Sequence, residues 1–151
     1  MNALTYFHHD EPTLGMGDRR FGVLELVHAI ETPTHLSKAY QIRFAILNKL
    51  RSAGWSKEVR LSSLSGITVT SMQQNTALCL QTGNMSRFYA DLIKLQYLFV
   101  IGNIQDAVYI VLTRKLAKQL GSNLAHFERL VEELKLFDKV ITVPMLVVGI
   151  E

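Results

Sequence analysis

The sequence is poor in cysteine and has no long apolar segment. Its single cysteine, Cys79, cannot form a disulfide within the chain, which favours a reducing compartment. No stretch of about 18 apolar residues is available to cross a bilayer. The first residues also lack the basic region and following apolar region of a signal peptide. We therefore expect a cytoplasmic protein that does not associate with membranes.

Repeats, low-complexity tracts and linker-like composition are absent beyond Gly17. The length of 151 residues suits about one domain with a core of ordinary size, so we expect a single domain over residues 1–151. Hydrophobic residues make up 48% and charged residues 19%, as in a folded globular protein. The net charge of +3 permits nucleic-acid binding, although many ordinary enzymes have a similar excess.

Hydrophobic periodicity predicts helices and strands in a mixed order. Helices are predicted at residues 23–30, from about Leu36 to Ala53, from Ser86 to about Ile101, after a Thr113 cap, and after a Ser122 or Asn123 cap. Strands are predicted at residues 4–8, 59–61, 67–69, 76–82, 104–112 and 145–150. This order indicates an α/β fold in which a mixed β-sheet is flanked by helices.

Basic residues are frequent in the helix predicted from Leu36. They are Lys38, Arg43, Lys49 and Arg51. Such a set forms either a phosphate-contacting surface or an ordinary solvated face, and the sequence leaves both interpretations open.

The most informative stretch is the strand predicted at residues 76–82 together with the turn and helix that follow it. Alternation places Ala77, Cys79 and Gln81 on one face of this strand. Gly83 and Asn84 form a turn, after which the apolar spacing becomes helical. The local architecture is therefore a buried strand, a tight turn and a helix that Ser86 or Asn84 can cap.

This stretch resembles the core of the PD-(D/E)xK nuclease superfamily, and most closely the BglII-like type II restriction endonucleases. The family motif has an aspartate at a strand end, later a glutamate, then a glutamine after one spacer, and further residues in the turn and helix. The matching residues here are Gln81, Gly83, Asn84, Arg87, Asp91, Leu92 and Lys94. The resemblance implies a restriction-endonuclease-like fold whose motif-bearing core covers about residues 36–150.

Both acidic positions of the motif differ in this chain. When the spacing of the family motif is aligned on Gln81, Cys79 stands at the position of the glutamate and Thr70 at that of the aspartate. Magnesium is a hard ion that proteins bind through carboxylates, whereas a thiol is a soft ligand. The resemblance therefore places the family's catalytic positions at Thr70, Cys79 and Gln81, with no metal site and no expected cofactor. Mg²⁺ would be required only if displaced acids such as Glu58 or Glu25 restored activity.

Each motif residue also has a structural interpretation. A free cysteine such as Cys79 is commonly a small buried core residue, and a nucleophilic thiol would need a histidine partner. Gln81 either hydrogen-bonds the turn or keeps a role near the scissile phosphate. Arg87 and Lys94 either join Asp91 in intrahelical ion pairs or face DNA. On the family interpretation, Asn84, Arg87 and Lys94 are the DNA-binding residues.

These observations lead to competing functional hypotheses. The first is a catalytically degenerate restriction-endonuclease-like protein that binds duplex DNA as a homodimer or serves as the non-cutting subunit of a catalytic partner. The second is an active metal-dependent type II endonuclease that uses displaced acids. The third is a protein-interaction module without DNA binding.

Overall fold

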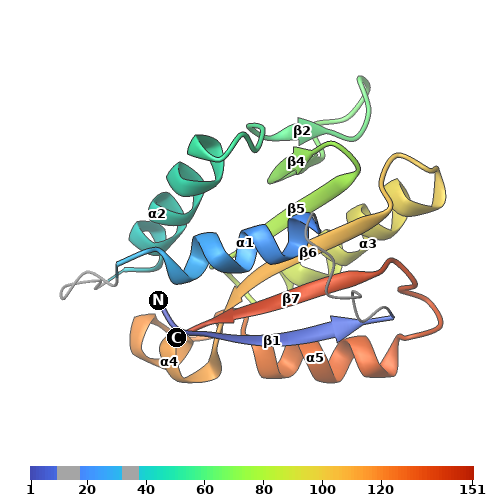
Figure 1. The fold of residues 1–151 in the computed structure, drawn as a ribbon. Coiled ribbons are helices and arrows are strands. Elements are labelled where there is room, and N and C mark those ends of the chain that lie inside the picture. The colour runs from blue at the N-terminus through green and yellow to red at the C-terminus, as the bar shows by residue number, and fades with distance from the viewer. Residues whose placement is uncertain (10–17, 32–37) are drawn as a thin grey trace.

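The computed structural model describes residues 1–9, 18–31 and 38–151. Within these residues a mixed sheet of five strands has the order β1-β7-β6-β5-β4 (Figure 1). The strands are β1 (Ala3–His8), β4 (Ser71–Gln73), β5 (Thr76–Gln81), β6 (Asp106–Leu112) and β7 (Met145–Ile150). A separate antiparallel hairpin is formed by β2 (Val59–Arg60) and β3 (Thr68–Val69). The predicted α/β fold with a mixed sheet is confirmed.

Helices cover both faces of the sheet (Figure 1). They are α1 (Arg19–His28), α2 (Ala39–Ser52), α3 (Arg87–Val100), α4 (Arg114–Leu120) and α5 (Phe127–Leu136). One buried cluster joins α3 and α5 to one face of the sheet, and the other joins α1, α2 and α4 to the opposite face. In the described part of the chain, no helix combines the length and apolar character needed to traverse a bilayer.

The central strands β5, β6 and β7 are parallel, so their carboxyl ends lie at one edge of the sheet. This is the left-hand edge in Figure 1. Helix α3 connects β5 to its parallel neighbour β6. Two parallel neighbouring strands require such a crossover connection, which is usually a helix. Functional side chains that follow parallel strands lie together at such an edge. The residues after Gln81 are therefore candidates for a functional site.

The alternation predicted for β5 is confirmed. Ala77 and Cys79 belong to the cluster formed with α3 and α5, whereas Leu78 and Leu80 belong to the cluster formed with α1, α2 and α4. Every residue from Thr76 to Leu80 is buried because β5 is covered on both faces. Only Gln81, the last residue of the strand, is partly exposed.

Several helix ends differ from the predictions. Helix α1 begins at Arg19 because Asp18 caps it, with Oδ1 accepting a hydrogen bond from Arg20 N at 2.9 Å. Neither Ser122 nor Asn123 caps α5, since His126 Nδ1 accepts from Arg129 N at 3.3 Å.

The predicted Thr113 cap of α4 is confirmed by a bond from Leu116 N to Thr113 Oγ1 of 3.4 Å. Helix α2 begins at Ala39, and the predicted start near Leu36 lies outside the described residues. At α3, Ser86 is the N-cap residue, and the Asn84 side chain accepts from Ser86 N at 2.9 Å.

The strand β4 was not predicted. It covers only Ser71–Gln73 and has little apolar alternation, so its conformation comes from pairing with β5. The turn between β4 and β5 places Gln74 at a positive φ of 50°. As a result Thr70, immediately before β4, lies beside the carboxyl-terminal half of β5, where its Oγ1 accepts from Leu80 N at 3.1 Å.

Candidate nucleic-acid interface

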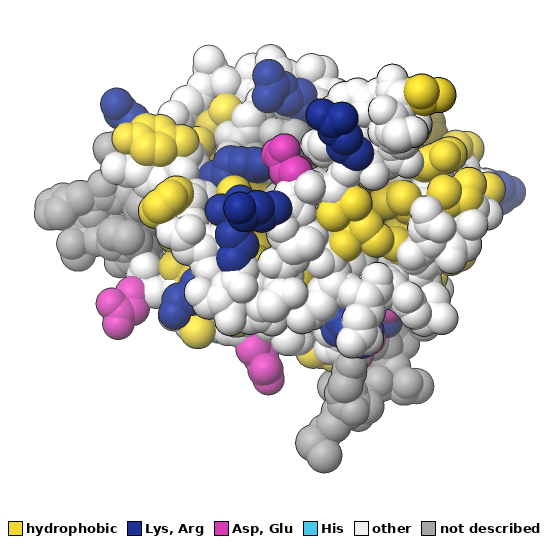
Figure 2. Space-filling view, turned by 90° about the horizontal axis from the view of Figure 1, so that it is seen from above, with side chains coloured by type: hydrophobic (Ala, Val, Ile, Leu, Met, Phe, Trp, Pro, Cys, Tyr) yellow, Lys and Arg dark blue, Asp and Glu magenta, His cyan; other side chains and the backbone are white. Residues whose placement is uncertain are grey.

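A cavity of about 390 Å³ opens at the carboxyl end of β5, between α2, the β2–β3 hairpin and α3. We call it the basic cavity because three cationic side chains line it: Arg43 from α2, and Arg87 and Lys94 from α3. Its other charged residues are Glu58 and Asp91. Figure 2 shows Lys and Arg side chains gathered around a hollow on this face, with an acidic side chain beside them. Thr70, Gln81 and Gly83 also line the cavity.

Asp91 is the centre of the hydrogen-bond network at the floor of the basic cavity. The residue is 8% exposed. Oδ2 accepts from Gln81 Nε2 at 2.9 Å and from the Tyr109 hydroxyl at 2.9 Å, while Oδ1 accepts from Lys94 Nζ at 3.0 Å. A carboxylate with so little water contact needs such donors, because an unpaired buried charge is strongly destabilising. Asp91 therefore holds Gln81 and Lys94 in fixed positions.

Gln81 connects this network to the turn. Its Oε1 accepts from Gly83 N at 2.9 Å, which confirms the interpretation that Gln81 hydrogen-bonds the turn. A Cβ atom at Gly83 would lie 3.1 Å from that same Oε1, so glycine allows the close approach. Both ends of the Gln81 amide are thus engaged by the protein itself.

Cys79 does not line the basic cavity. Its side chain is 1% exposed and packs in the core between β5 and α3. Burial, and then the nearby Asp91 charge, raise the pKa of the Cys79 thiol far above its usual value. Of the three positions that the resemblance makes catalytic, Thr70 and Gln81 line the basic cavity and Cys79 does not. The thiol is a neutral core group in this environment, as its structural interpretation proposed.

The cations of the basic cavity come from two helices. Arg43 of α2 donates from Nη1 to the carbonyl oxygen of Leu80, which ties it to the end of β5. Lys94 is partly buried by its ion pair with Asp91, whereas Arg87 is exposed at the start of α3. The other basic residues predicted on α2 do not line this cavity; these are Lys38, Lys49 and Arg51. Sequence gave no signal to separate Arg43 from them, because the distinction depends on packing against β5.

Thr70, Cys79 and Asp91 form a donor set that does not fit Mg²⁺. Thr70 supplies a neutral hydroxyl whose oxygen already accepts a hydrogen bond, and Cys79 is a buried neutral thiol. The Asp91 oxygens are engaged by three protein donors. Over residues 1–9, 18–31 and 38–151, no group of three or more His, Cys, Asp or Glu side chains is placed to hold an ion. Magnesium is normally bound through carboxylates together with water and phosphate, so this set offers poor ligands.

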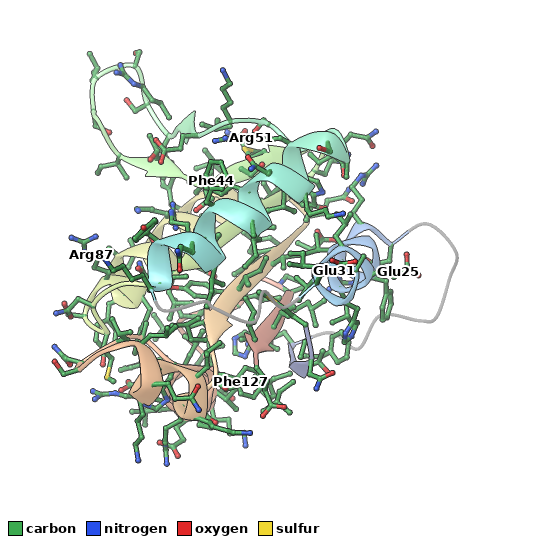
Figure 3. All side chains as sticks on the ribbon, turned by 90° about the vertical axis from the view of Figure 1, so that its left-hand side faces the viewer. Glu25, Glu31, Phe44, Arg51, Arg87 and Phe127 are labelled. Carbon is green, nitrogen blue, oxygen red and sulfur yellow. The ribbon has the colours of Figure 1, made fainter. Side chains whose placement is uncertain are left out.

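The displaced acids considered from sequence lie in different places. Glu58 lines the basic cavity. Glu25 lies on α1, and Figure 3 shows it on the opposite side of the molecule from Arg87. Only Glu58 of these two is therefore near the motif residues.

Comparisons with known proteins agree with this architecture. The family model described as restriction endonuclease BglII/BglIII matches residues 23–150. A crystal structure of restriction endonuclease BglII complexed with a DNA 16-mer is similar, with a TM-score of 0.83 and 11% sequence identity over 100% of this chain and 78% of that one. Free BglII gives a TM-score of 0.75 and 11% identity over 100% and 80% of the two chains. Comparison with curated protein sequences gives no match. At this identity the structural likeness establishes the fold.

Proposed function

This chain belongs to the BglII/BglIII restriction endonuclease family, and from that premise we propose that it binds duplex DNA without cutting it. The observation that carries the proposal is the composition of the basic cavity. Three cations, Arg43, Arg87 and Lys94, surround the end of β5. The motif resemblance assigns the family's acidic positions to Thr70 and Cys79, neither of which is acidic. Binding and cleavage depend on different groups, so one can persist without the other.

DNA affinity comes mainly from cations that replace counterions along the phosphate backbone. Arg87 is exposed at the rim and is suited to a direct phosphate contact. Lys94 is held toward the cavity by Asp91 at 3.0 Å, which fixes its position before any ligand arrives. Asn84 is exposed in the turn beside them and has amide hydrogens available for a base edge or a phosphate. The related BglII structure was solved in complex with DNA, which supports this substrate class.

Hydrolysis of a phosphodiester by this type of enzyme needs a divalent ion that supplies a hydroxide and neutralises charge in the transition state. The residues at the family's catalytic positions, Thr70, Cys79 and Gln81, include no carboxylate. Gln81 is already bonded to Gly83 and Asp91. We therefore propose that no metal cofactor is bound and that these positions now stabilise the fold.

We further propose that the protein acts as a homodimer or as the non-cutting subunit of a catalytic partner. An apolar groove of about 440 Å³ adjoins the basic cavity, and Ala90 and Lys94 line both. Ile93 and Tyr97 on the outer face of α3 are 67% and 45% exposed. Contiguous apolar surface of this kind marks association sites. Light scattering of the unchanged protein and of an Ile93→Ser variant tests self-association, and a monomer at all concentrations would contradict the homodimer.

The proposed function is tested by two assays on one preparation. Plasmid DNA is incubated with Mg²⁺ and with Mn²⁺, and duplex binding is measured at roughly 50 and 200 mM salt, a range over which several phosphate contacts change affinity by orders of magnitude. We expect salt-dependent binding and no cleavage. Arg87→Gln should weaken binding, whereas Lys139→Gln, an exposed residue beyond α5, should not.

A second candidate function rests on Glu58, which lines the basic cavity. If the unchanged protein cuts DNA, the active endonuclease becomes the better account, and Glu58→Gln should then abolish cleavage while leaving binding intact. If no binding is found even at the lower salt, the remaining hypothesis is the protein-interaction module.

A further inference from the structure

A second cavity with cationic residues lies next to the basic cavity. Its volume is about 390 Å³, and we call it the α4 cavity because Arg114 and Lys118 of α4 line it. Met85, Asn123 and His126 are among its other lining residues. Figure 3 faces the edge where the parallel strands end, and it shows α4 on the same side as Arg87. None of the motif residues assigned from the sequence lies in this cavity.

The two cavities share one wall, the turn of residues 83–85. Gly83 lines the basic cavity and Met85 lines the α4 cavity. The turn is held in place by pairing with the segment before α5: Ala125 N donates to Gly83 O at 2.8 Å, and Met85 N donates to Asn123 O at 2.9 Å. Asn84 forms an isolated bridge with Leu124 between these bonds. The wall is therefore a paired segment with cations on both sides.

The cations of the α4 cavity are available to a ligand. Arg114 and Lys118 are four residues apart on α4, which places both side chains on one face of the helix. Both residues are exposed. Within the described part of the chain, neither side chain takes part in an ion pair. Glu128 is nearby, but it accepts from the backbone N of Arg114 at 2.8 Å and lies 3.3 Å from His126 Nδ1.

We propose that the α4 cavity is a second phosphate-binding subsite for the duplex that occupies the basic cavity. Arg114 and Lys118 contact backbone phosphates on one side of the 83–85 turn, and Arg87 and Lys94 contact them on the other. This inference rests on the proposed function and adds the partner contacts of α4 to it. Asn84, which is exposed in the middle of this turn, then lies between the two sets of phosphate contacts and faces a groove of the duplex.

The chemistry favours phosphate over other anions that would need a closed site. Arginine binds phosphate oxygens through a planar fork and lysine binds them as a point charge, and both remain solvated when the site is empty. An open cavity with an exposed rim suits a long polymer that passes through it. In addition, a pair of cations on each side of the 83–85 turn matches a duplex, whose phosphates flank each groove.

The test is the salt dependence of duplex binding by the full chain, using a short duplex of random sequence. Each lost phosphate contact should lower the slope of log affinity against log salt by about 0.9 and reduce affinity roughly eightfold near 0.1 M salt. We expect Arg114→Gln combined with Lys118→Gln to lower the slope by about twice that amount. Lys118→Arg keeps the charge and should retain the slope. Circular dichroism checks that each variant is folded.

The matched control is Lys115→Gln. Lys115 is exposed on the same helix but does not line the α4 cavity. The slope of log affinity against log salt should therefore be the same in this variant as in the unchanged protein. An equal loss in this control would overturn the subsite, because it would indicate a diffuse charge effect. If Arg87→Gln weakens binding while the Arg114 and Lys118 changes have no effect, the subsite is wrong and the proposed function stands. If the unchanged protein binds no duplex, both are wrong.

Discussion

The hydroxyl of Tyr109 offers the most direct test of the network beneath the basic cavity. Tyr109 lies on β6 and is fully buried, and its hydroxyl donates to Asp91 Oδ2 at 2.9 Å. Burial, followed by the nearby Asp91 charge, raises the pKa of Tyr109 well above its usual value, so the hydroxyl keeps its proton at all ordinary pH values. Tyr109→Phe removes this donor and preserves the shape of the ring. Among the described residues, the Asp91 carboxylate then keeps Gln81 and Lys94 as side-chain partners.

The expected cost follows from the charge of the acceptor. A hydrogen bond to a charged group contributes about 1.5–3 kcal/mol, and a buried acceptor that loses its donor cannot recover it from water. A loss of about 2 kcal/mol should lower Tm by roughly 4–8 °C in a domain of this size. Urea denaturation should show a lower midpoint with an unchanged m-value, which would assign the effect to stability. Tyr40→Phe is the matched control, because Tyr40 is 63% exposed on α2 and should change stability little.

A double-mutant cycle with Asp91→Asn isolates the pair. Residues in one hydrogen-bond network are coupled, so Tyr109→Phe should cost less in the Asp91→Asn background by about 0.5–3 kcal/mol. The reasoning would be refuted if Tyr109→Phe cost no more than Tyr40→Phe, or if the two changes at Asp91 and Tyr109 were additive. A functional readout accompanies the cycle: because Asp91 also holds Lys94, Asp91→Asn should alter the salt slope of DNA binding.

Three further predictions concern other parts of the fold. Burial chiefly lowers the pKa of His8 below its usual 6.5, so the folded state binds fewer protons than the unfolded state; stability should fall as the pH drops below about 6.5. Urea midpoints at several pH values check this, and a His8→Asn variant should show a shallower decline. Cys79 should resist thiol reagents in the native protein and react once urea unfolds it, because its thiol is buried and its pKa is raised; fast native labelling would contradict this. Gly149→Ala should destabilise by about 1–3 kcal/mol or more, since the new Cβ would lie 2.6 Å from the Phe127 ring; a melting scan equal to that of the unchanged protein would exclude this clash.

Local patterns in the sequence were sufficient for the elements that carry the motif. The alternation of Ala77 to Gln81 defined which face of β5 each side chain occupies, because successive residues of a strand point to opposite sides. The change to helical spacing after Gly83 and Asn84 located α3 to within a residue at each end. The resemblance of Gln81, Arg87 and Lys94 to a nuclease motif identified the family, which the family model then matched over residues 23–150. Each of these patterns depends on residues that are close to one another in the sequence, so it can be recognised without the tertiary structure.

Contacts between distant residues decided the rest. Strand β4 exists because it pairs with β5, and His126 rather than Ser122 or Asn123 caps α5 because that segment pairs with the turn after β5. Arg43 reaches the basic cavity because its turn of α2 packs over the end of β5. No local pattern distinguishes these residues from their neighbours.

The character of the site was likewise settled by tertiary structure. An intrahelical ion pair at Asp91 was one of two interpretations that the sequence left open. The structure contains the pair with Lys94, and Asp91 also bonds to Gln81 and Tyr109, so the network joins three separate elements. Cys79 and Gln81 share a face of β5, yet only Gln81 reaches the cavity, because α3 covers Cys79 and the strand ends at Gln81. Alternation along a strand gives the direction of a side chain, whereas the elements packed over it determine whether that side chain meets solvent, a ligand or the core.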